Sequence, residues 1–221
     1  MRFYPPVIII LFLFSIFALV FFFILLQLHI ITFAFEKLGF SAFAVFVILM
    51  GSLIGSLINI PLKELPCEEF HLGSVSFWGM RYRSPVFRQG CTLLTINLGG
   101  AIIPSLVSVY LWANGSSLII PILATVIVAL VVNRVARPVR GLGIATPIFI
   151  PPLITLVVAF LLAPNDAPRT AYIAGTMGTL IGADFLNLKK IAGLGAPVAS
   201  IGGAGTFDGI FVTGILAVLL A

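Results

Sequence analysis

Apolar segments joined by short polar connections occupy most of this chain and restrict its fold more than any other feature. Several approach the roughly 20 residues that cross a bilayer as an α-helix. Charged residues make up only 9% of the chain, against roughly 25% in an average soluble domain. We therefore expect an all-α integral membrane protein: a single transmembrane domain over residues 1–221, forming a bundle of about seven transmembrane helices. The expected spans cover residues 5–31, 40–60, 91–113, 117–133, 145–163, 169–188 and 200–221.

The basic residues lie on one side of this expected bundle. Ten of the 12 Lys and Arg residues fall at the N-terminus or in the second, fourth and sixth connections, and only Lys37 and Arg169 fall on the other side. The positive-inside rule then predicts a cytoplasmic N-terminus and an outside C-terminus in the cell membrane. The net charge of +5 fits contact with anionic lipid, so we expect the lipid bilayer and no nucleic acid as a partner. The first segment, Val7–Leu26, is too long for the roughly 7–15 apolar residues of a signal peptide, and we expect it to be retained.

The connection over residues 61–90 is the longest one, and we expect it in the cytoplasm. Its Phe70–Tyr82 part mixes apolar and polar residues around two glycines, which predicts a small hairpin. Cys67 and Cys91 flank this loop, and we expect both as reduced thiols because the cytoplasm is reducing. The Cys67–His71 run contains metal-ligand residue types without a recognised spacing, so we expect no metal and no cofactor.

Two pairs of short segments resemble each other. Met50–Gly55 matches Met177–Gly182, and further on Leu98–Ala101 matches Ile201–Ala204. The matches occur in the same order, which predicts that the second and third spans and the sixth and seventh are copies of one unit. The resulting 3+1+3 parallel repeat is an arrangement that some transporters use. The alternative is that small residues recur because they let helices pack closely in membranes.

Asp184 and Asp208 are the acidic residues that the apolar pattern does not place in a loop. They lie in Gly-Ala-Asp184-Phe-Leu-Asn and Gly-Thr-Phe-Asp208-Gly and flank a glycine-rich stretch. A helix from Asp208 to Ala221 would reach only about 21 Å, short of the roughly 30 Å hydrocarbon core, so Asp208 is expected inside the membrane near its cytoplasmic face. Asp184 comes about one turn before Lys189 and is expected at a similar depth. The two carboxylates are therefore predicted to meet.

A buried pair of carboxylates has a specific chemistry. In a low dielectric the two cannot both ionise, so one holds a proton near neutral pH. Such a pair can activate a water as general base while the partner donates a proton, as in aspartic proteolysis. It can also carry protons or cations in a small transporter or channel. The structural alternatives are an Asp184 neutralised by Lys189 or Lys190 and a helix N-cap at Asp208.

The order of these motifs resembles the intramembrane aspartyl proteases of the presenilin and signal peptide peptidase family. That family carries Tyr-Asp followed by Gly-x-Gly-Asp. Gly205 and Asp208 match the first Gly and the Asp of the second motif, and Asp184 takes the first role. Ala183 and Phe207 depart from the pattern. The resemblance implies that both aspartates are catalytic and that the substrate is a membrane helix. As a whole, the chain is more similar to an uncharacterised bacterial and archaeal family of polytopic membrane proteins, a domain of unknown function.

Two further sets of residues are candidates for contacts. The residues of the first set are expected to let a substrate approach the backbone, and their alternative role is to let helices pack closely. This set comprises Gly202, Gly203, Gly205 and Asn187. The second set is expected to contact lipid headgroups at the cytoplasmic face, besides setting the topology. It comprises Arg134, Arg137 and Arg140.

The sequence therefore predicts a multi-pass membrane protein whose best specific function is that of an intramembrane aspartyl-type protease acting through Asp184 and Asp208. A small transporter or channel that uses the same acids for proton or cation coupling is the alternative. A non-catalytic lipid-binding or structural membrane protein is the third interpretation. The expected partners are the bilayer and either a membrane-helix substrate or a small ion or solute.

Overall fold

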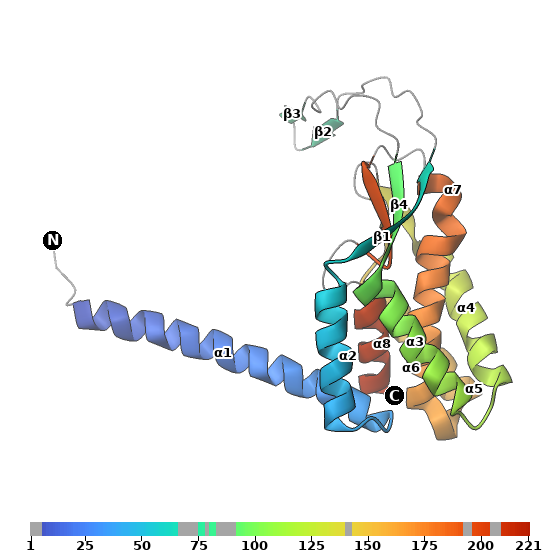
Figure 1. Cartoon of the computed structure of the whole chain (residues 1–221), viewed down its shortest axis with the longest axis horizontal. Helices are drawn as coiled ribbons and strands as arrows, with labels where there is room; N and C mark the ends of the chain where they lie inside the picture. The colour runs from blue at the N-terminus through green and yellow to red at the C-terminus, as the bar shows by residue number, and fades with distance from the viewer. Residues whose placement is uncertain are drawn as a thin grey trace.

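The computed structural model describes residues 6–65, 75–77, 80–82, 92–139, 143–191, 196–203 and 209–221. This part of the chain is mostly helical, with the larger sheet at one end of the helical bundle (Figure 1). Its α-helices are α1 (Pro6–Lys37), α2 (Ala42–Gly55), α3 (Ile103–Ala113), α4 (Ile119–Val135), α5 (Ile150–Leu162), α6 (Ala167–Thr179), α7 (Leu188–Ile191) and α8 (Gly209–Leu220). Its strands are β1 (Asn59–Leu65), β2 (Val75–Phe77), β3 (Met80–Tyr82), β4 (Thr92–Asn97), β5 (Arg137–Val139), β6 (Gly143–Ala145) and β7 (Val198–Ile201). The shorter elements are the π-helical turns η1 (Leu98–Ile102) and η3 (Leu180–Asp184) and the 3-10 turns η2 (Pro164–Asp166) and η4 (Phe185–Asn187).

Helix α6 lies inside the bundle and packs against α3, α4, α5 and α8. Ten of its 13 residues are buried. Its glycines allow this close packing: a Cβ on Gly178 would lie 2.7 Å from Val128 of α4. A Cβ on Gly175 would lie 3.2 Å from Thr155 of α5 and 3.4 Å from Thr213 of α8. Small residues at such contacts let helix backbones approach closely, so α6 can have neighbours on several sides.

The C-terminal end of α1 is anchored to the bundle, whereas its N-terminal part projects away from it (Figure 1). The fully buried ring of Phe35 lies 5.8 Å from the ring of Tyr172 of α6 and 5.9 Å from the ring of Phe40. Lys37 Nζ donates a hydrogen bond to the carbonyl of Val218, near the end of α8, at 3.4 Å. A cation near the C-terminus of a helix is favourable because unpaired carbonyls gather there.

The three-stranded sheet has the order β1–β4–β7. Its central strand, β4, is antiparallel to β1 and parallel to β7, so that Ile96 pairs with both Ile60 and Ile201. The hydroxyl of Thr92 donates to the carbonyl of Ala196 at 2.8 Å and adds a side-chain bond to the parallel pair. Four of the six residues of β4 are buried, whereas β1 is mostly exposed. The sheet therefore caps one end of the bundle, with β4 mostly buried, β7 partly buried and β1 mostly exposed.

This sheet corrects the all-α prediction at three of the expected spans. Residues 40–60 end in β1, residues 91–113 begin with β4, and residues 200–221 begin at the end of β7. For β4 and β7 the reason is physical: a short strand that is largely buried has the same continuous hydropathy as a buried helix. Apolar character alone does not separate the two.

Two hairpins accompany the sheet. Within the connection where the sequence predicts a small hairpin, β2 pairs with β3 in antiparallel register, Val75 opposite Tyr82. The second hairpin joins β5 to β6, with Arg137 opposite Ala145. It precedes α5, which starts at Ile150 with prolines in its first turn. A proline there costs nothing because the first helical N–H groups have no partner within the helix.

The helices at the second to seventh expected spans are short. α2 has 14 residues, α3 11, α4 17, α5 13, α6 13 and α8 12. Among the residues whose side chains the structure describes, no single helix is both long and apolar enough to cross a membrane. By length and composition, α5 together with the run Pro164–Ile191 meets that requirement as a pair, with a bend of 120° between its two parts.

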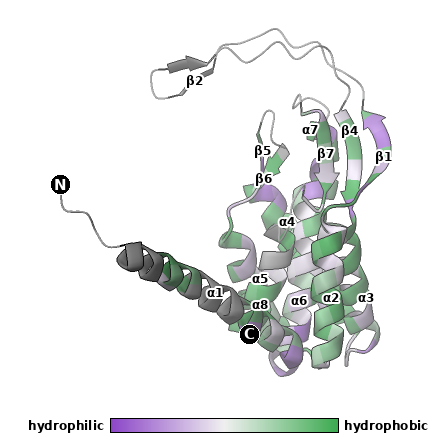
Figure 2. Cartoon of the chain, turned by 60° about the vertical axis from the view of Figure 1, so that its left-hand side comes forward, coloured by the Kyte–Doolittle hydropathy of each residue, from purple (hydrophilic) through white to green (hydrophobic). Residues whose placement is uncertain are grey.

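Polarity is distributed unusually between the surface and the interior of the bundle. Figure 2 shows strongly hydrophobic colouring over α2 and α3 and paler colouring along the inner helix α6. Large apolar side chains are exposed on the outer helices, among them Phe43 (77%), Ile119 (76%) and Leu161 (76%). Threonines are buried inside, among them Thr155 and Thr170. Buried polar groups and large exposed apolar surface are the informative departures from a water-soluble pattern.

Candidate functional site

The carboxyl ends of β4 and β7 meet at one edge of the sheet because the two strands are parallel neighbours. Each strand leads into two consecutive glycines: Gly99-Gly100 within η1 and Gly202-Gly203 directly after β7. In open α/β sheets, ligands bind in the crevice beyond the carboxyl ends of parallel strands. The same geometry makes this edge the candidate site here.

Gly100 and Gly202 are in direct contact at this edge. The carbonyl oxygen of Gly202 fills the space that a Cβ on Gly100 would need. A Cβ on Gly202 would in turn lie 2.7 Å from the backbone nitrogen of Ala101. Gly202 also has a φ of +84°, which is costly for any residue with a Cβ. The two strand ends can therefore touch only if both positions are glycine.

Asn97, at the end of β4, joins four elements through one fully buried amide. Its Nδ2 donates to the carbonyl of Ser56 at 2.8 Å and to Oδ1 of Asn59 at 3.1 Å. Its Oδ1 accepts from the N–H of Gly100 at 2.6 Å, which caps the start of η1. The Oδ1 of Asn59 also accepts from the hydroxyl of Ser200 at 2.7 Å. This network fixes the end of α2, β1, β4 and β7 relative to one another.

Asp184 is the last residue of η3, which continues α6 towards the sheet. Its Oδ2 accepts a hydrogen bond from the N–H of Gly202 at 2.8 Å, and the residue is half-buried. In a continuous α-helix, a residue five positions after Thr179 would point about 140° away from it. The π turn closes a wider loop of five residues, so Asp184 returns to the side of Thr179. The π turn thus directs the carboxylate at the Gly-Gly turn after β7.

Two amides hold η3 in this conformation. Asn187 is fully buried, and its Nδ2 donates to the carbonyls of Gly182 at 3.0 Å and Ala183 at 2.9 Å. The Nδ2 of Asn133, from α4, donates to the same Gly182 carbonyl at 3.1 Å. The Oδ1 of Asn187 accepts from Lys190 Nζ at 2.7 Å. Asn187, which the sequence places near an approaching substrate, is therefore engaged in supporting the turn that carries Asp184.

The structure describes Gly202 and Gly203, two of the glycines that the sequence predicts to let a substrate approach the backbone. Gly202 and Gly203 both have positive φ values, +84° and +79°. The N–H of Gly202 binds Asp184 and its carbonyl packs on Gly100, so this backbone approaches other parts of the same chain. Several predicted positions lie outside the described residues: Asp208, Gly205, Arg140, Cys67 and Cys91.

The sheet end of the bundle is rich in basic side chains. Arg134 in the last turn of α4, Arg137 in β5 and Lys189 in α7 are exposed. Their charges can attract an anionic surface at this end. In the described ranges, no group of three or more His, Cys, Asp or Glu side chains is arranged to hold a metal ion.

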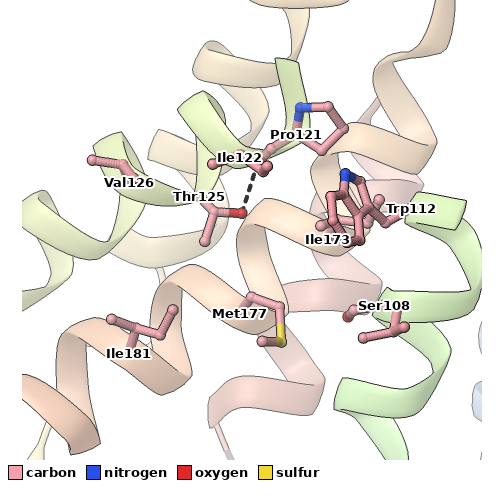
Figure 3. Close-up of a pocket in the computed structure, with 10 residues that line it drawn as sticks. Ser108, Trp112, Pro121, Ile122, Thr125, Val126, Ile173, Met177 and Ile181 are labelled. Carbon is pink, nitrogen blue, oxygen red and sulfur yellow. Dashed lines mark hydrogen bonds between the residues drawn. The ribbon is translucent and has the colours of Figure 1, made fainter. Parts of the chain in front are cut away.

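A pocket of about 300 Å³ opens between α3, α4 and α6, and its lining is almost wholly apolar (Figure 3). Trp112 and Met177 are among the side chains that line it. Its hydroxyl-bearing residues, Ser108 and Thr125, donate to carbonyls of their own helices at 2.9 and 2.7 Å. The pocket therefore offers no unpaired polar group for chemistry, and Asp184 is not part of its lining.

Sequence reasoning finds Asp184 and the glycines of this site but misses Ser56 and Ser200. Small polar residues at strand ends form no motif, and their partners become neighbours only through the tertiary fold. The repeated segments also differ in their packing. Gly55 of the first copy contacts Gly99, whereas Gly182 of the second packs against Ala129 of α4.

No curated protein and no solved structure matches the chain. A family with the description "Protein of unknown function (DUF1614)" matches residues 53–220, a range that includes the sheet, both π turns and α8. This match confirms the prediction of an uncharacterised family. The chain therefore belongs to the DUF1614 family of proteins of unknown function.

Proposed function

We propose that this chain is an integral membrane protein that acts as an intramembrane aspartyl-type protease, with Asp184 and Asp208 as its catalytic pair. The distribution of polarity supports membrane insertion. The outer helices expose large apolar side chains such as Phe43 and Ile119, whereas hydroxyl groups such as that of Thr155 are buried. Extensive exposed apolar surface is a liability in water and becomes favourable when lipid covers it.

In this proposal the sheet end of the bundle faces the cytoplasm, because the exposed Arg134, Arg137 and Lys189 lie there. The rise from Ala167 to Asp184 is about 27 Å at 1.5 Å per residue, against roughly 30 Å for the hydrocarbon core. Asp184 then lies just inside the cytoplasmic boundary of the membrane. An ionisable group at that depth is expensive and usually serves a function.

The observation that carries the proposal is the 2.8 Å hydrogen bond from the N–H of Gly202 to Oδ2 of Asp184. It attaches the Gly-Gly turn after β7 to the carboxylate, and from this turn the chain continues towards Asp208. On the other side, α8 begins at Gly209 and packs along α6. Both ends of the segment that contains Asp208 are thus held against the helix that carries Asp184. This arrangement favours a pair of carboxylates.

The proposed reaction is peptide-bond hydrolysis. The ionised aspartate removes a proton from water, whose oxygen attacks the substrate carbonyl carbon, while the protonated aspartate donates its proton to the carbonyl oxygen. The resulting gem-diol breaks its C–N bond as the nitrogen takes up a proton from the first aspartate, and the second recovers a proton from the diol. One water is consumed, and a carboxyl group and an amine are released. Two carboxylates that share one proton in a low dielectric provide the starting state.

Proton or cation transport is a second candidate. The polar interior of α6, where Thr170, Thr176 and Thr179 are all buried, supports it. Polar groups inside a membrane bundle mark ion or proton pathways in many transporters. In this alternative the two aspartates would bind the coupled ion and no bond would be cleaved.

The test compares Asp184→Asn and Asp208→Asn with the parent protein in liposomes that also contain a tagged single-helix substrate. We expect the parent to cleave the substrate and each variant to lose cleavage by about 100-fold or more, as for loss of a general acid or base. Asp166→Asn is the matched control, because Asp166 precedes α6 and forms a partly exposed ion pair with Arg169 in the first turn of that helix. It should cleave at the parent rate.

A pH-sensitive dye inside the same liposomes separates the two candidates. If proton flux depends on Asp184 and no substrate is cleaved, the result supports the transporter and rejects the protease. Cleavage that survives either single substitution would exclude the catalytic pair.

A further inference from the structure

The apolar pocket between α3, α4 and α6 opens sideways from the bundle (Figure 3). The inner helix α6 forms its floor, where Ile173 is only 5% exposed. On α4 its rim includes Ile122 and Val126, which are 50% and 48% exposed. Since α3 and α4 both pack on α6, the pocket lies at the outer surface between them. Material that surrounds the bundle can therefore enter this pocket and touch α6.

The lining suits a flexible hydrocarbon. The volume of about 300 Å³ lies at the lower end of the range for ligand pockets. Its polar groups already have partners: Nε1 of Trp112 donates to the carbonyl of Leu118 at 2.8 Å, and the hydroxyls of Ser108 and Thr125 donate within their own helices. Met177 adds an unbranched side chain that adapts to irregular shapes. A ligand here is thus held by apolar contact and not by hydrogen bonds.

One side of α4 connects this pocket to a basic side chain. Val126, Leu130 and Arg134 are spaced four residues apart and therefore lie on the same side of the helix. Leu130 is 59% exposed, and Arg134 is exposed as well. The rise from Val126 to Arg134 is about 12 Å. If Arg134 lies at the cytoplasmic boundary, the pocket lies within one leaflet, whose hydrocarbon is about 15 Å thick. The material at that depth is lipid acyl chain.

The charge at the headgroup end of this path is positive. Over residues 70–165 the sequence contains no Asp or Glu. Arg137, in β5, is exposed three residues after Arg134. Of the described acids at the sheet end, Asp184 already accepts a hydrogen bond from the backbone after β7, and Glu64 lies on the edge strand β1. The two arginines therefore favour an anionic headgroup.

We propose that the pocket binds one acyl chain of an anionic phospholipid from the cytoplasmic leaflet, whose phosphate contacts Arg134 and Arg137. The proposal rests on the membrane insertion proposed above and is independent of the aspartate pair. Charge alone would attract many lipids to the sheet end without fixing any of them. The pocket adds a place for one chain, so a single lipid is held in a defined position against α6.

The experiment uses the fluorescence of Trp112, which lines the pocket. Trp78 is the only other tryptophan in the sequence, and Trp78→Phe leaves Trp112 as the single reporter. The protein is titrated in detergent with phospholipids whose acyl chains carry bromine, which quenches a tryptophan on contact. We expect phosphatidylglycerol to quench at a lower concentration than phosphatidylcholine with the same chains. Arg134→Gln should raise that concentration about fivefold, since one basic residue beside an anionic headgroup contributes about 1 kcal/mol.

A matched pair of double variants tests the pocket itself. Ile122→Phe with Val126→Phe fills the space from two rim positions, so we expect it to remove at least half of the quenching of Trp112. Val157→Phe with Leu161→Phe is the control on α5. These two positions are also four residues apart and exposed, at 53% and 76%, and they do not line the pocket. The control should be quenched like the parent.

Three results would overturn the proposal. The first is equal quenching by the two headgroups, because charge would then select nothing. The second is equal quenching in the two double variants, because the chain would then touch Trp112 from outside the pocket. The third is a dimeric protein without quenching, which would assign the pocket to a second copy. A protein that stays soluble after detergent is removed would instead reject membrane insertion, and cleavage that survives Asp184→Asn would leave the lipid site standing.

Discussion

Replacing Gly202 with alanine tests the contact between the two strand ends. Gly202 has a φ of +84°, a conformation that costs a residue with a Cβ about 1–2 kcal/mol. The new methyl group would lie 2.7 Å from the nitrogen of Ala101 and 2.8 Å from the carbonyl carbon of Gly100, so the main chain itself must move. Such overpacking typically costs about 1–3 kcal/mol. Together the two effects predict that the free energy of unfolding falls by about 2–5 kcal/mol.

Gly39→Ala is the matched control for this prediction. Gly39 has a φ of +87°, but a Cβ there would meet nothing within 4 Å. It should therefore lose only the conformational part, about 1–2 kcal/mol. Both variants are unfolded by denaturant in the same detergent, and the free energies are obtained by linear extrapolation. Equal losses in the two variants would refute the reasoning, because contact with Ala101 and Gly100 would then contribute nothing.

Two further predictions concern the network and the basic surface. Asn97→Ala leaves the carbonyl of Ser56 and the N–H of Gly100 without their partner. Denaturant unfolding should therefore show that the free energy of unfolding falls by about 1–3 kcal/mol for each buried group left unpaired. A fall below about 0.5 kcal/mol would contradict the network. Arg134→Gln combined with Arg137→Gln should weaken the rise in unfolding temperature that anionic lipid produces in the parent, since each basic residue near an anionic surface contributes about 1 kcal/mol. Lys37→Gln, at the other end of the bundle, should respond to the lipid like the parent.

The helices of the bundle could be predicted from the sequence because long apolar runs leave few alternatives. The expected span 117–133, for example, coincides closely with α4 at Ile119–Val135. Strand β4 could not be predicted, because Thr92–Asn97 continues directly into η1 and α3 with no connecting loop between strand and helix. Its parallel partner β7 is also distant in the chain, with Thr92 and Ala196 separated by 104 residues. Local periodicity contains no information about such a pairing.

The candidate site was predictable to a similar extent. Asp184 stands out in the sequence because a carboxylate is costly among apolar residues. Its contact with Gly202 was not predictable, because it depends on one extra residue per turn in η3. That π turn has no sequence signature of its own and is held by Asn133 and Asn187 from outside it. The prediction that Asp184 meets Asp208 stays a prediction.

The parallel pairing of β4 with β7 has a consequence for how the protein is made. The ribosome adds about 5–20 residues per second, so the 104 residues from Thr92 to Ala196 take about 5–20 s to synthesise. During that interval one edge of the central strand has no partner strand, and unpaired edges invite association with other chains. A nascent chain stalled before Val198 would keep that edge open indefinitely. Cellular quality control should therefore remove chains stalled before Val198 faster than chains stalled a few residues after β7 is complete.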